Sequence, residues 1–288
     1  MKVSENPNMR PKTFTIPDST DPHHMADLLR IKNFRLLDDD FFTKCFEGDT
    51  KCIELILRII LNKPDLNVVS VRTQVFVENL LNRSVRLDVL ASDSLGRIFN
   101  IEIQRADKGA GRRRARYNSS MLDANLLEKG AGFDMLPETF VIFITENDIF
   151  KKGEPFYQIE RCFVKTGEPF EDGAHILYVN GAYQNESPLG KLMHDFACSD
   201  PSDMYYDVLA DRVRFFKEEK EGIAVMCKAM EDMRRESMQE GIKEGISKGM
   251  KSAALRMLNA GKYTLDEIVS ISGLSLEEIQ KLKAKDMN

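Results

Sequence analysis

Hydrophobic and polar residues alternate along residues 86–104, and this alternation predicts two β-strands joined by a tight turn. In the second strand, Ile101 and Ile103 point to one face, whereas the polar Glu102 points to the other. One face of the hairpin is therefore expected to join the hydrophobic core, and the other to carry polar chemistry.

The turn determines which residues of the two strands face each other. If residues 94–96 form a three-residue loop with Gly96 in the left-handed conformation, Asp88 lies opposite Glu102. Two carboxylates facing each other on one side of a sheet are destabilising unless something compensates their charge. Mg²⁺ would do so, because it typically binds one or two carboxylates together with water and phosphate oxygens. The competing interpretation is an ordinary exposed polar face, and the hairpin alone does not decide between the two.

The remaining pattern predicts a mixed sheet flanked by helices, in the order α-β-β-β-α-β. Residues 1–35 form a proline-containing arm that leads into a short helix. The apolar run 139–145 is uninterrupted, which indicates a strand buried on both faces. The other predicted elements are a helix over 39–62 ended by Pro64, a strand over 68–80, a helix over 112–129 and strands near 156–164 and 175–179.

The chain from about residue 204 to 259 has a charged, methionine-rich helical pattern. Gly241, Gly245 and Gly249 recur every four residues and so line one face of this helix. Each glycine costs roughly 1 kcal/mol of helix propensity relative to alanine, so a compensating close contact with another helix is one hypothesis. That hypothesis predicts a homo-oligomer formed through the C-terminal helices. A solvated helix stabilised by charge pairs is the alternative, and the sequence favours neither.

Residues 264–279 read as two short helices separated by a Ser-Gly turn. Thr264 and Ser275 each precede a glutamate by three residues, which is the spacing of a capping box. The arrangement resembles a helix-turn-helix, but its second helix opens with Glu277 and Glu278, which would repel DNA. We therefore favour a packing or interaction module over a DNA reader. The predicted parts of the chain are an arm (1–35), a sheet domain (36–200), a charged helical region (201–259) and this small module (260–288).

The composition is that of a water-soluble globular protein, with 42% hydrophobic and 30% charged residues in 288. The sequence shows neither a signal peptide nor an apolar run long enough to span a membrane, so we expect a cytoplasmic location without a membrane partner. The five cysteines are odd in number and include no CxxC pair. Reduced thiols are therefore expected rather than a disulfide framework or a zinc site.

The overall net charge of −5 does not by itself suggest a nucleic-acid-binding protein. The local charge does, because residues 86–116 contain eight basic residues against four acidic ones, a net charge of +4. The break at Gly109 and Gly111 allows a helix to start near residue 112, and its basic residues could reach a DNA backbone. A solvated helix face is the other interpretation. The candidate DNA-binding residues are Arg105, Arg112, Arg113, Arg114, Arg116 and Tyr117.

Asp88, the hairpin and the Glu102-Ile103-Gln104 run together resemble the PD-(D/E)XK nuclease core. The resemblance is to the variant of the Rpn family of recombination-promoting nucleases and transposases, in which the last position is commonly Gln. It extends to the opening helical residues 39–62 and to the Arg/Tyr-bearing helix 113–117, and it covers roughly residues 36–180. The tail from about residue 220 is similar to the glycine-spaced ending of these proteins.

This resemblance implies an α/β fold of the restriction-endonuclease-like type with a helical C-terminal extension. It also implies a metal-dependent DNA endonuclease linked to recombination or to a mobile element. Asp88 and Glu102, with the Ile103 carbonyl, would hold Mg²⁺ or Mn²⁺, which would activate a water for phosphodiester hydrolysis. Gln104 completes the set of catalytic residues, but a neutral amide can only position water and cannot act as a base.

Two alternatives stay open. An acid on the opening helix often approaches the metal in the resembled fold, which makes Glu54 a candidate additional acid. A surface pair between Glu54 and Arg58, four residues apart, is slightly favoured instead. The alternative for the whole chain is a catalytically weak DNA-binding or protein-interaction protein that retains the nuclease fold.

Overall fold

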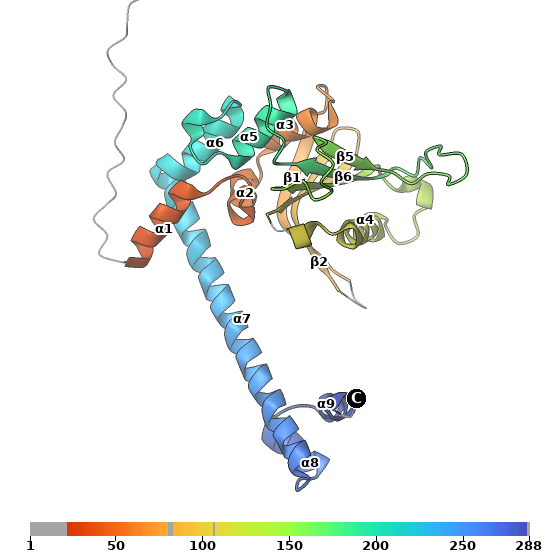
Figure 1. The fold of residues 1–288 in the computed structure, drawn as a ribbon, viewed down its shortest axis with the longest axis vertical. Coiled ribbons are helices and arrows are strands. Elements are labelled where there is room, and N and C mark those ends of the chain that lie inside the picture. The colour runs from red at the N-terminus through yellow and green to blue at the C-terminus, as the bar shows by residue number, and fades with distance from the viewer. Residues whose placement is uncertain (1–21, 80–82, 106, 287–288) are drawn as a thin grey trace, which may run out of the picture. The chain divides into compact units, whose positions relative to one another are not determined.

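The computed structural model describes residues 22–79, 83–105 and 107–286 (Figure 1). Residues 1–21 of the predicted arm lie outside this description. The expected short helix is α1 (Pro22–Asn33), which lies within the range 1–35 assigned to the arm. Within the described residues, no helix is long and apolar enough to cross a membrane.

Six strands form one mixed sheet in the order β1-β2-β3-β4-β6-β5 (Figure 1). The first three strands are antiparallel neighbours, β3, β4 and β6 run parallel to one another, and β5 pairs antiparallel with β6 at the edge. The predicted mixed sheet is therefore confirmed. The strands are β1 (Val68–Val77), β2 (Val85–Asp93), β3 (Ile98–Gln104), β4 (Thr139–Thr145), β5 (Phe156–Ile159) and β6 (Ala174–Asn180).

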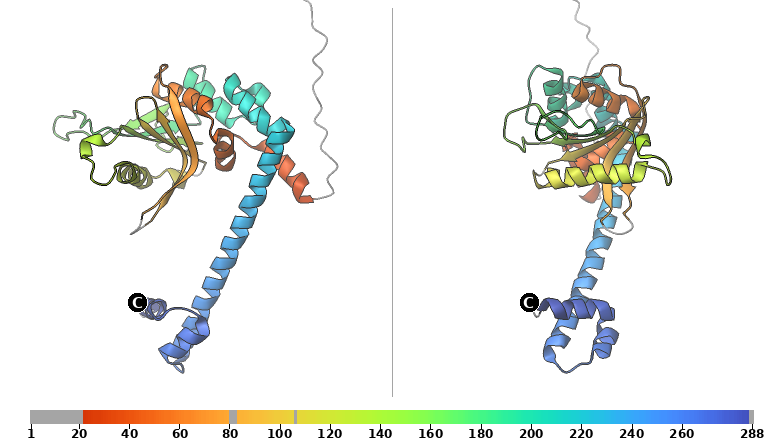
Figure 2. Two further views of the ribbon diagram at one scale, coloured as in Figure 1. Left: turned by 180° about the vertical axis from the view of Figure 1, so that it is seen from behind. Right: turned by 90° about the vertical axis from the view of Figure 1, so that its right-hand side faces the viewer.

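Helices cover both faces of this sheet (Figure 2). Helix α4 packs on one face, where it contacts β4 and β6, and α2 and α3 pack against β1 from the other side. All seven residues of β4 are buried, as its apolar run predicted. Helices α5 and α6 pack against α3. Of these two, α5 was not predicted. The bounds are α2 (Asp39–Phe46), α3 (Thr50–Leu61), α4 (Arg112–Leu126), α5 (Pro188–Ala197) and α6 (Asp207–Glu218).

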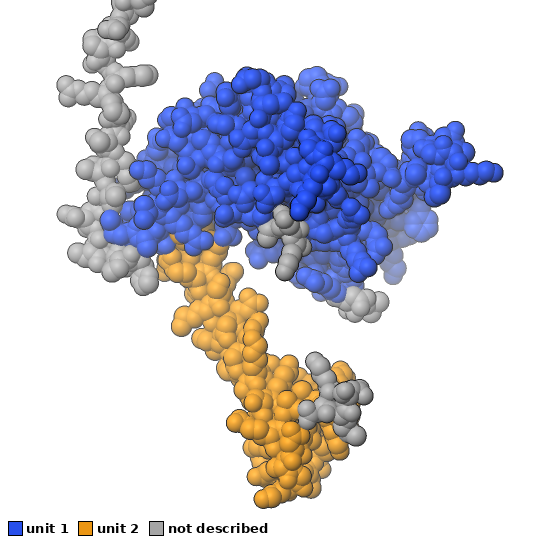
Figure 3. Space-filling view, in the orientation of Figure 1, with its two compact units in different colours: residues 1–226 blue, residues 227–288 orange. Residues whose placement is uncertain are grey.

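The contacts of the chain divide it into two compact units, residues 1–226 and 227–288 (Figure 3). The sheet and its covering helices belong to the first unit. The second unit contains most of the long helix α7 (Lys220–Ala260) together with α8 (Leu265–Ser272) and α9 (Leu276–Asp286).

The prediction of one opening helix over residues 39–62 is wrong, because a break separates α2 from α3. Gly48 adopts a left-handed φ of 69°, which favours glycine and ends the first helix. Asp49 then caps α3 by accepting a hydrogen bond from the backbone N–H of Cys52 at 3.0 Å. Asn62, also left-handed, ends α3 before Pro64 is reached.

The predicted register of the β2–β3 hairpin is confirmed. Val89 pairs with Ile101, and the pairing continues without interruption towards the turn. Gly96 is left-handed, with φ 78°, and its N–H donates to the carbonyl of Asp93 at 3.0 Å. These residues close the expected three-residue loop. The regular pairing ends at Val89 and Ile101, one step before Asp88 and Glu102, and beyond it the Asp88 side chain accepts the backbone N–H of Ile103.

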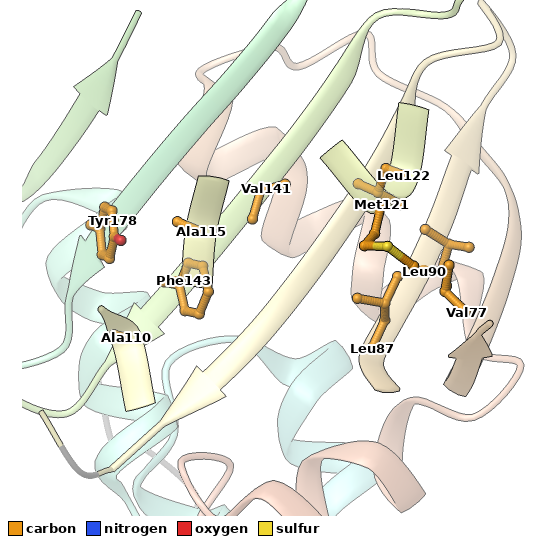
Figure 4. Packing of buried hydrophobic residues seen from close by; sticks show 10 residues of the cluster. All are labelled: Val77, Leu87, Leu90, Ala110, Ala115, Met121, Leu122, Val141, Phe143 and Tyr178. Carbon is orange, nitrogen blue, oxygen red and sulfur yellow. The ribbon is translucent and has the colours of Figure 1, made fainter. Parts of the chain in front are cut away.

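The polar face of the hairpin is buried, whereas the competing interpretation of an ordinary polar face required it to be exposed. Leu90 of β2 and Phe143 of β4 lie on that face, in one hydrophobic cluster with Met121 and Leu122 of α4 (Figure 4). Phe143 also stacks on Tyr178 of β6, with ring centroids 5.3 Å apart. Helix α4 therefore encloses the side of the sheet that carries the acids.

The second unit is a small helical module, and both of its predicted capping interactions are present. Thr264 and Glu267 bond reciprocally at the start of α8, and Ser275 and Glu278 do so at the start of α9. Ala254 of α7 is fully buried in a cluster that also includes Ile268, Leu274 and Ile279. The two short helices are thus packed against the end of α7, as a packing module requires.

Candidate active site

Asp88 on β2 and Glu102 on β3 form a buried pair of acids. Asp88 is 6% exposed and Glu102 is 0% exposed. Charged side chains are almost never buried to this degree unless they are paired or bind a metal. The interpretation of the hairpin as an ordinary exposed polar face is therefore wrong.

The hydrogen bonds of the two carboxylates leave part of their capacity unused. The Oδ2 atom of Asp88 accepts the backbone N–H of Ile103 at 3.0 Å, which ties Asp88 to the opposite strand. The Oε2 atom of Glu102 accepts from the guanidinium of Arg114 at 2.8 Å. The other oxygen, Oε1, is buried and accepts no hydrogen bond of good geometry among the described residues, and both polar atoms of the Asn100 side chain are in the same state. The Asn100 side chain and the backbone N–H of Asp88 nevertheless lie near enough to the Glu102 carboxylate to lower its pKa. Buried polar groups of this kind are usually satisfied by an ordered water, an ion or a ligand.

Electrostatics at the pair favour the uptake of positive charge. Burial raises the pKa of Asp88 to about 8, and the nearby charges of Glu102 and Asp39 act in the same direction. Burial also raises the pKa of Glu102, although the Arg114 guanidinium opposes this shift. The protein therefore holds two carboxylates close together. When both are ionised, neighbouring groups do not fully compensate their negative charge.

A hard divalent cation fits this arrangement. Within the described part of the chain, no three His, Cys, Asp or Glu side chains come together closely enough to hold a metal by themselves. Mg²⁺ does not require such a cage, because it keeps several waters and is often held by one or two carboxylates. The Oε1 atom of Glu102 is available as a ligand, and the Ile103 carbonyl remains a predicted one.

Gln104 lies next to Arg114 and against the short turn that precedes α4. Its Oε1 atom accepts a long hydrogen bond of 3.4 Å from Arg114 Nη1. A Cβ atom added at Gly109 would come within 1.7 Å of that same oxygen, so glycine leaves the space that the Gln104 amide fills. The sequence indicated Gly109 only as a break before the helix, and nothing local in it predicted this contact.

The acid of the opening helices whose charge acts on the pair is Asp39, not Glu54. Glu54 forms an ion pair with Arg58 at 2.7 Å and accepts the backbone N–H of Val68 at 2.9 Å, so it stabilises the start of β1. The pair between Glu54 and Arg58, which the sequence favoured, is thus present, but it is partly buried and not on the open surface. Asp39, in α2, has a raised pKa because of burial, and its charge acts on both Asp88 and Glu102. Its only sequence signal was its place in the opening run of the family resemblance.

The candidate DNA-binding arginines have different surroundings. Arg113 and Arg116 are exposed on α4 and make no ion pair within the described residues. The guanidinium of Arg112 lies 5.2 Å from the ring centroid of Phe150. Arg105 is half exposed and already forms ion pairs of 2.7 Å with Asp38 and 3.3 Å with Glu146.

The hydroxyl of Tyr117, a predicted contact to a base or sugar, makes two hydrogen bonds within the protein. It donates to the carbonyl of Arg83 at 2.5 Å and accepts from the side-chain amide of Asn79 at 3.2 Å. Its ring packs against the cluster beneath α4. Tyr117 thus anchors the connection between β1 and β2.

The mixed sheet, the hairpin with one acid on each strand and the Glu-x-Gln end of β3 together define a PD-(D/E)XK nuclease-like domain. A comparison with protein families agrees, because residues 47–187 match the family described as PD-(D/E)XK nuclease family transposase. The matched region is just under half of the 288 residues. The resemblance inferred from the sequence is confirmed. Comparisons with curated proteins and with solved structures found no match.

Proposed function

We propose that this protein is a metal-dependent endonuclease that hydrolyses phosphodiester bonds in DNA. The observation that carries the proposal is the buried pair of Asp88 and Glu102, in which one carboxylate oxygen accepts no hydrogen bond of good geometry among the described residues. A nuclease and transposase family provides the reaction class. A role in recombination or in a mobile element, in the cytoplasm, is the biological context that we propose.

In the proposed mechanism, Asp88 and Glu102 would hold Mg²⁺ or Mn²⁺, together with the Ile103 carbonyl. When bound, the metal would lower the pKa of a water and stabilise the charge that develops on the scissile phosphate. The hydrogen bond from Ile103 N–H fixes the carboxylate of Asp88, so the pair is oriented before the metal arrives.

Gln104 would orient the attacking water. Its amide has a donor and an acceptor but does not ionise at ordinary pH, so it cannot remove the proton. The proton would leave to solvent. The space at Gly109 allows the Gln104 amide to lie between Arg114 and the turn before α4, which supports an ordered position.

The DNA backbone would lie along the start of α4. Arg112, Arg113 and Arg116 are exposed there, on the helix that also carries Arg114 into the acid pair. Lys and Arg contacts to phosphate supply most of the sequence-independent affinity for DNA. Arg105 is a weaker candidate, because binding DNA would require it to exchange its ion pairs with Asp38 and Glu146.

A second copy of the chain is the partner that we propose for α7. Met238, Ile242 and Ile246 are 69%, 51% and 59% exposed. At 100° per residue they lie on the same side of the helix as Gly245, where an added Cβ would meet nothing within 4 Å. An exposed apolar face beside small residues would be covered by close packing with another helix.

Cleavage of supercoiled plasmid tests the proposed function. Wild type, Asp88→Ala and Glu102→Ala would be purified in parallel and incubated with Mg²⁺, with Mn²⁺ or with a chelator. We expect nicking or linearisation by the wild type with metal only, and loss of it in both variants. Equal cleavage by all three proteins would indicate a contaminant and would favour the alternative, a catalytically weak DNA-binding or interaction protein with the nuclease fold.

A further inference from the structure

Arg114 connects three parts of the candidate site. Its Nη2 atom donates to Glu102 Oε2 at 2.8 Å, and its Nη1 atom donates to Gln104 Oε1 at 3.4 Å and to the Gly109 carbonyl at 3.2 Å. Its guanidinium also lies 6.0 Å from the ring centroid of Phe143, which pairs with Glu102 in the sheet. One side chain thus spans the metal acid, the water-positioning amide and the turn before α4.

The charges around Arg114 show why a cation is needed at this place. Asp88, Glu102 and Asp39 are negative when ionised, and Gln104 is neutral. Among the described residues, Arg114 alone forms an ion pair with either acid of the pair. A guanidinium remains charged at any ordinary pH, so its contribution does not depend on proton uptake.

The exposure of Arg114 differs sharply from that of its partner. Its side chain is 42% exposed, whereas the side chain of Glu102 is 0% exposed. The guanidinium therefore reaches from the buried carboxylate to solvent, at the place where a phosphate held by the acids and their metal would have to arrive. The fork of N–H donors of an arginine matches phosphate oxygens as well as carboxylate oxygens.

We propose that Arg114 is the resident cation of this active site. It neutralises the acid pair when no metal is bound, and it contacts the scissile phosphate when DNA is bound, where it supplies the positive charge that Gln104 lacks. This inference rests on the proposed nuclease function. It separates Arg114 from Arg113 and Arg116, which are exposed and would bind phosphates elsewhere along the backbone.

The test compares Arg114→Gln and Arg114→Lys with a matched control, Arg214→Gln. Arg214, in α6, is 40% exposed on its side chain and forms an ion pair with the exposed Asp211, so it matches Arg114 in exposure and in charge but lies outside the site. The first readout is the single-turnover rate of plasmid cleavage at saturating DNA. We expect Arg114→Gln to lose about 100-fold or more, which is the usual effect of removing one donor to developing charge. Arg114→Lys should be intermediate, and Arg214→Gln should equal the wild type.

The second readout needs neither DNA nor activity, because it is the affinity of the DNA-free protein for Mn²⁺ by titration calorimetry. Removing the competing cation in Arg114→Gln should tighten Mn²⁺ binding several-fold, and Arg214→Gln should not change it. A wild-type rate in Arg114→Gln, or a rate in Arg114→Lys no better than that of Arg114→Gln, would overturn the role at the phosphate. Unchanged or weakened Mn²⁺ binding would overturn the role at the acids.

The two readouts also keep this inference apart from the proposed function. If the wild type does not cleave DNA with any metal, the proposed function fails and the role at the phosphate fails with it. Tightened Mn²⁺ binding would then still support the neutralising role. If Arg114→Gln does not fold by circular dichroism, Arg114→Lys replaces it, because a lysine keeps the charge and loses the second contact. Its rate should then fall about tenfold or more, and a wild-type rate would contradict the proposal.

Discussion

The carboxylate of Asp88 accepts a hydrogen bond from the backbone N–H of Ile103, at 3.0 Å, across the β2–β3 hairpin. This bond holds Asp88 beside Glu102 on the buried face of the sheet. Gln104 is the next residue of β3 on the same face. The hairpin alone therefore brings together the two acids and the amide of the candidate site.

Stability should depend on pH through Asp88. Because burial raises the pKa of Asp88 to about 8, the folded protein binds more protons than the unfolded chain between about pH 4 and about pH 8. The free energy of unfolding of the metal-free protein should therefore fall as the pH rises through this window. Urea denaturation at pH 5 and pH 8 measures it. Asp88→Asn should weaken the dependence, and the same slope in wild type and variant would contradict the assignment.

Gly109→Ala should impair catalysis without unfolding the protein. The added Cβ would overlap the Oε1 atom of Gln104, so this flexible side chain must move away from Arg114. We expect a cleavage rate about tenfold lower, since a misplaced positioning group typically costs that much or more. Thermal unfolding should show little change in Tm. Gly111→Ala is the control, because its Cβ meets nothing within 4 Å, and it should cleave at the wild-type rate.

Removing the charge of Asp39 should change the Mg²⁺ requirement of cleavage, whereas removing the charge of Glu54 should not. Asp39→Asn removes a negative charge that acts on both metal acids, so the Mg²⁺ concentration for half-maximal cleavage should rise several-fold. Glu54→Gln should leave that concentration unchanged, because Glu54 is bonded to Arg58 and to the start of β1. A Mg²⁺ titration of plasmid cleavage compares them. A larger effect in Glu54→Gln would restore Glu54 as the additional acid.

Self-association should depend on the exposed face of α7. Replacing Ile242 and Ile246 with glutamate places charge on the apolar face beside Gly245. We expect the mass in solution, measured by light scattering, to fall towards that of one chain of 32.9 kDa. Lys243→Glu is the control for added negative charge next to that face. A wild-type protein that is already monomeric would remove the self-association proposal.

Local sequence features predicted the hairpin well, because each depends on a few adjacent residues. The left-handed Gly96 fixed the loop length and hence the register of the strands that carry Asp88 and Glu102. The two capping boxes of the C-terminal module are local in the same way. The break at Gly48 is also local. It was not predicted, because a glycine within an apolar periodic pattern is compatible with a continuous helix.

Features that depend on contacts distant in sequence could not be predicted. Burial of the acid pair requires α4 to fold back over the sheet, which the alternation of β3 does not indicate. The partner of Glu102 on that helix is one of four arginines in the run 112–116, and only the packing distinguishes Arg114 from the others. Asp39 acts on the acid pair because α2 packs against β1, β2 and β3, which are distant from it in sequence.

The most direct test of the account is the position of a bound metal. Crystals of the wild type soaked with Mn²⁺ would be measured at a wavelength where manganese scatters anomalously. We predict one or two anomalous peaks within bonding distance of the carboxylates of Asp88 and Glu102, absent from crystals of Asp88→Asn soaked in the same way. Well-ordered carboxylates without a peak between them, or a peak held only by other residues, would contradict the claim that this pair is the metal centre of a nuclease.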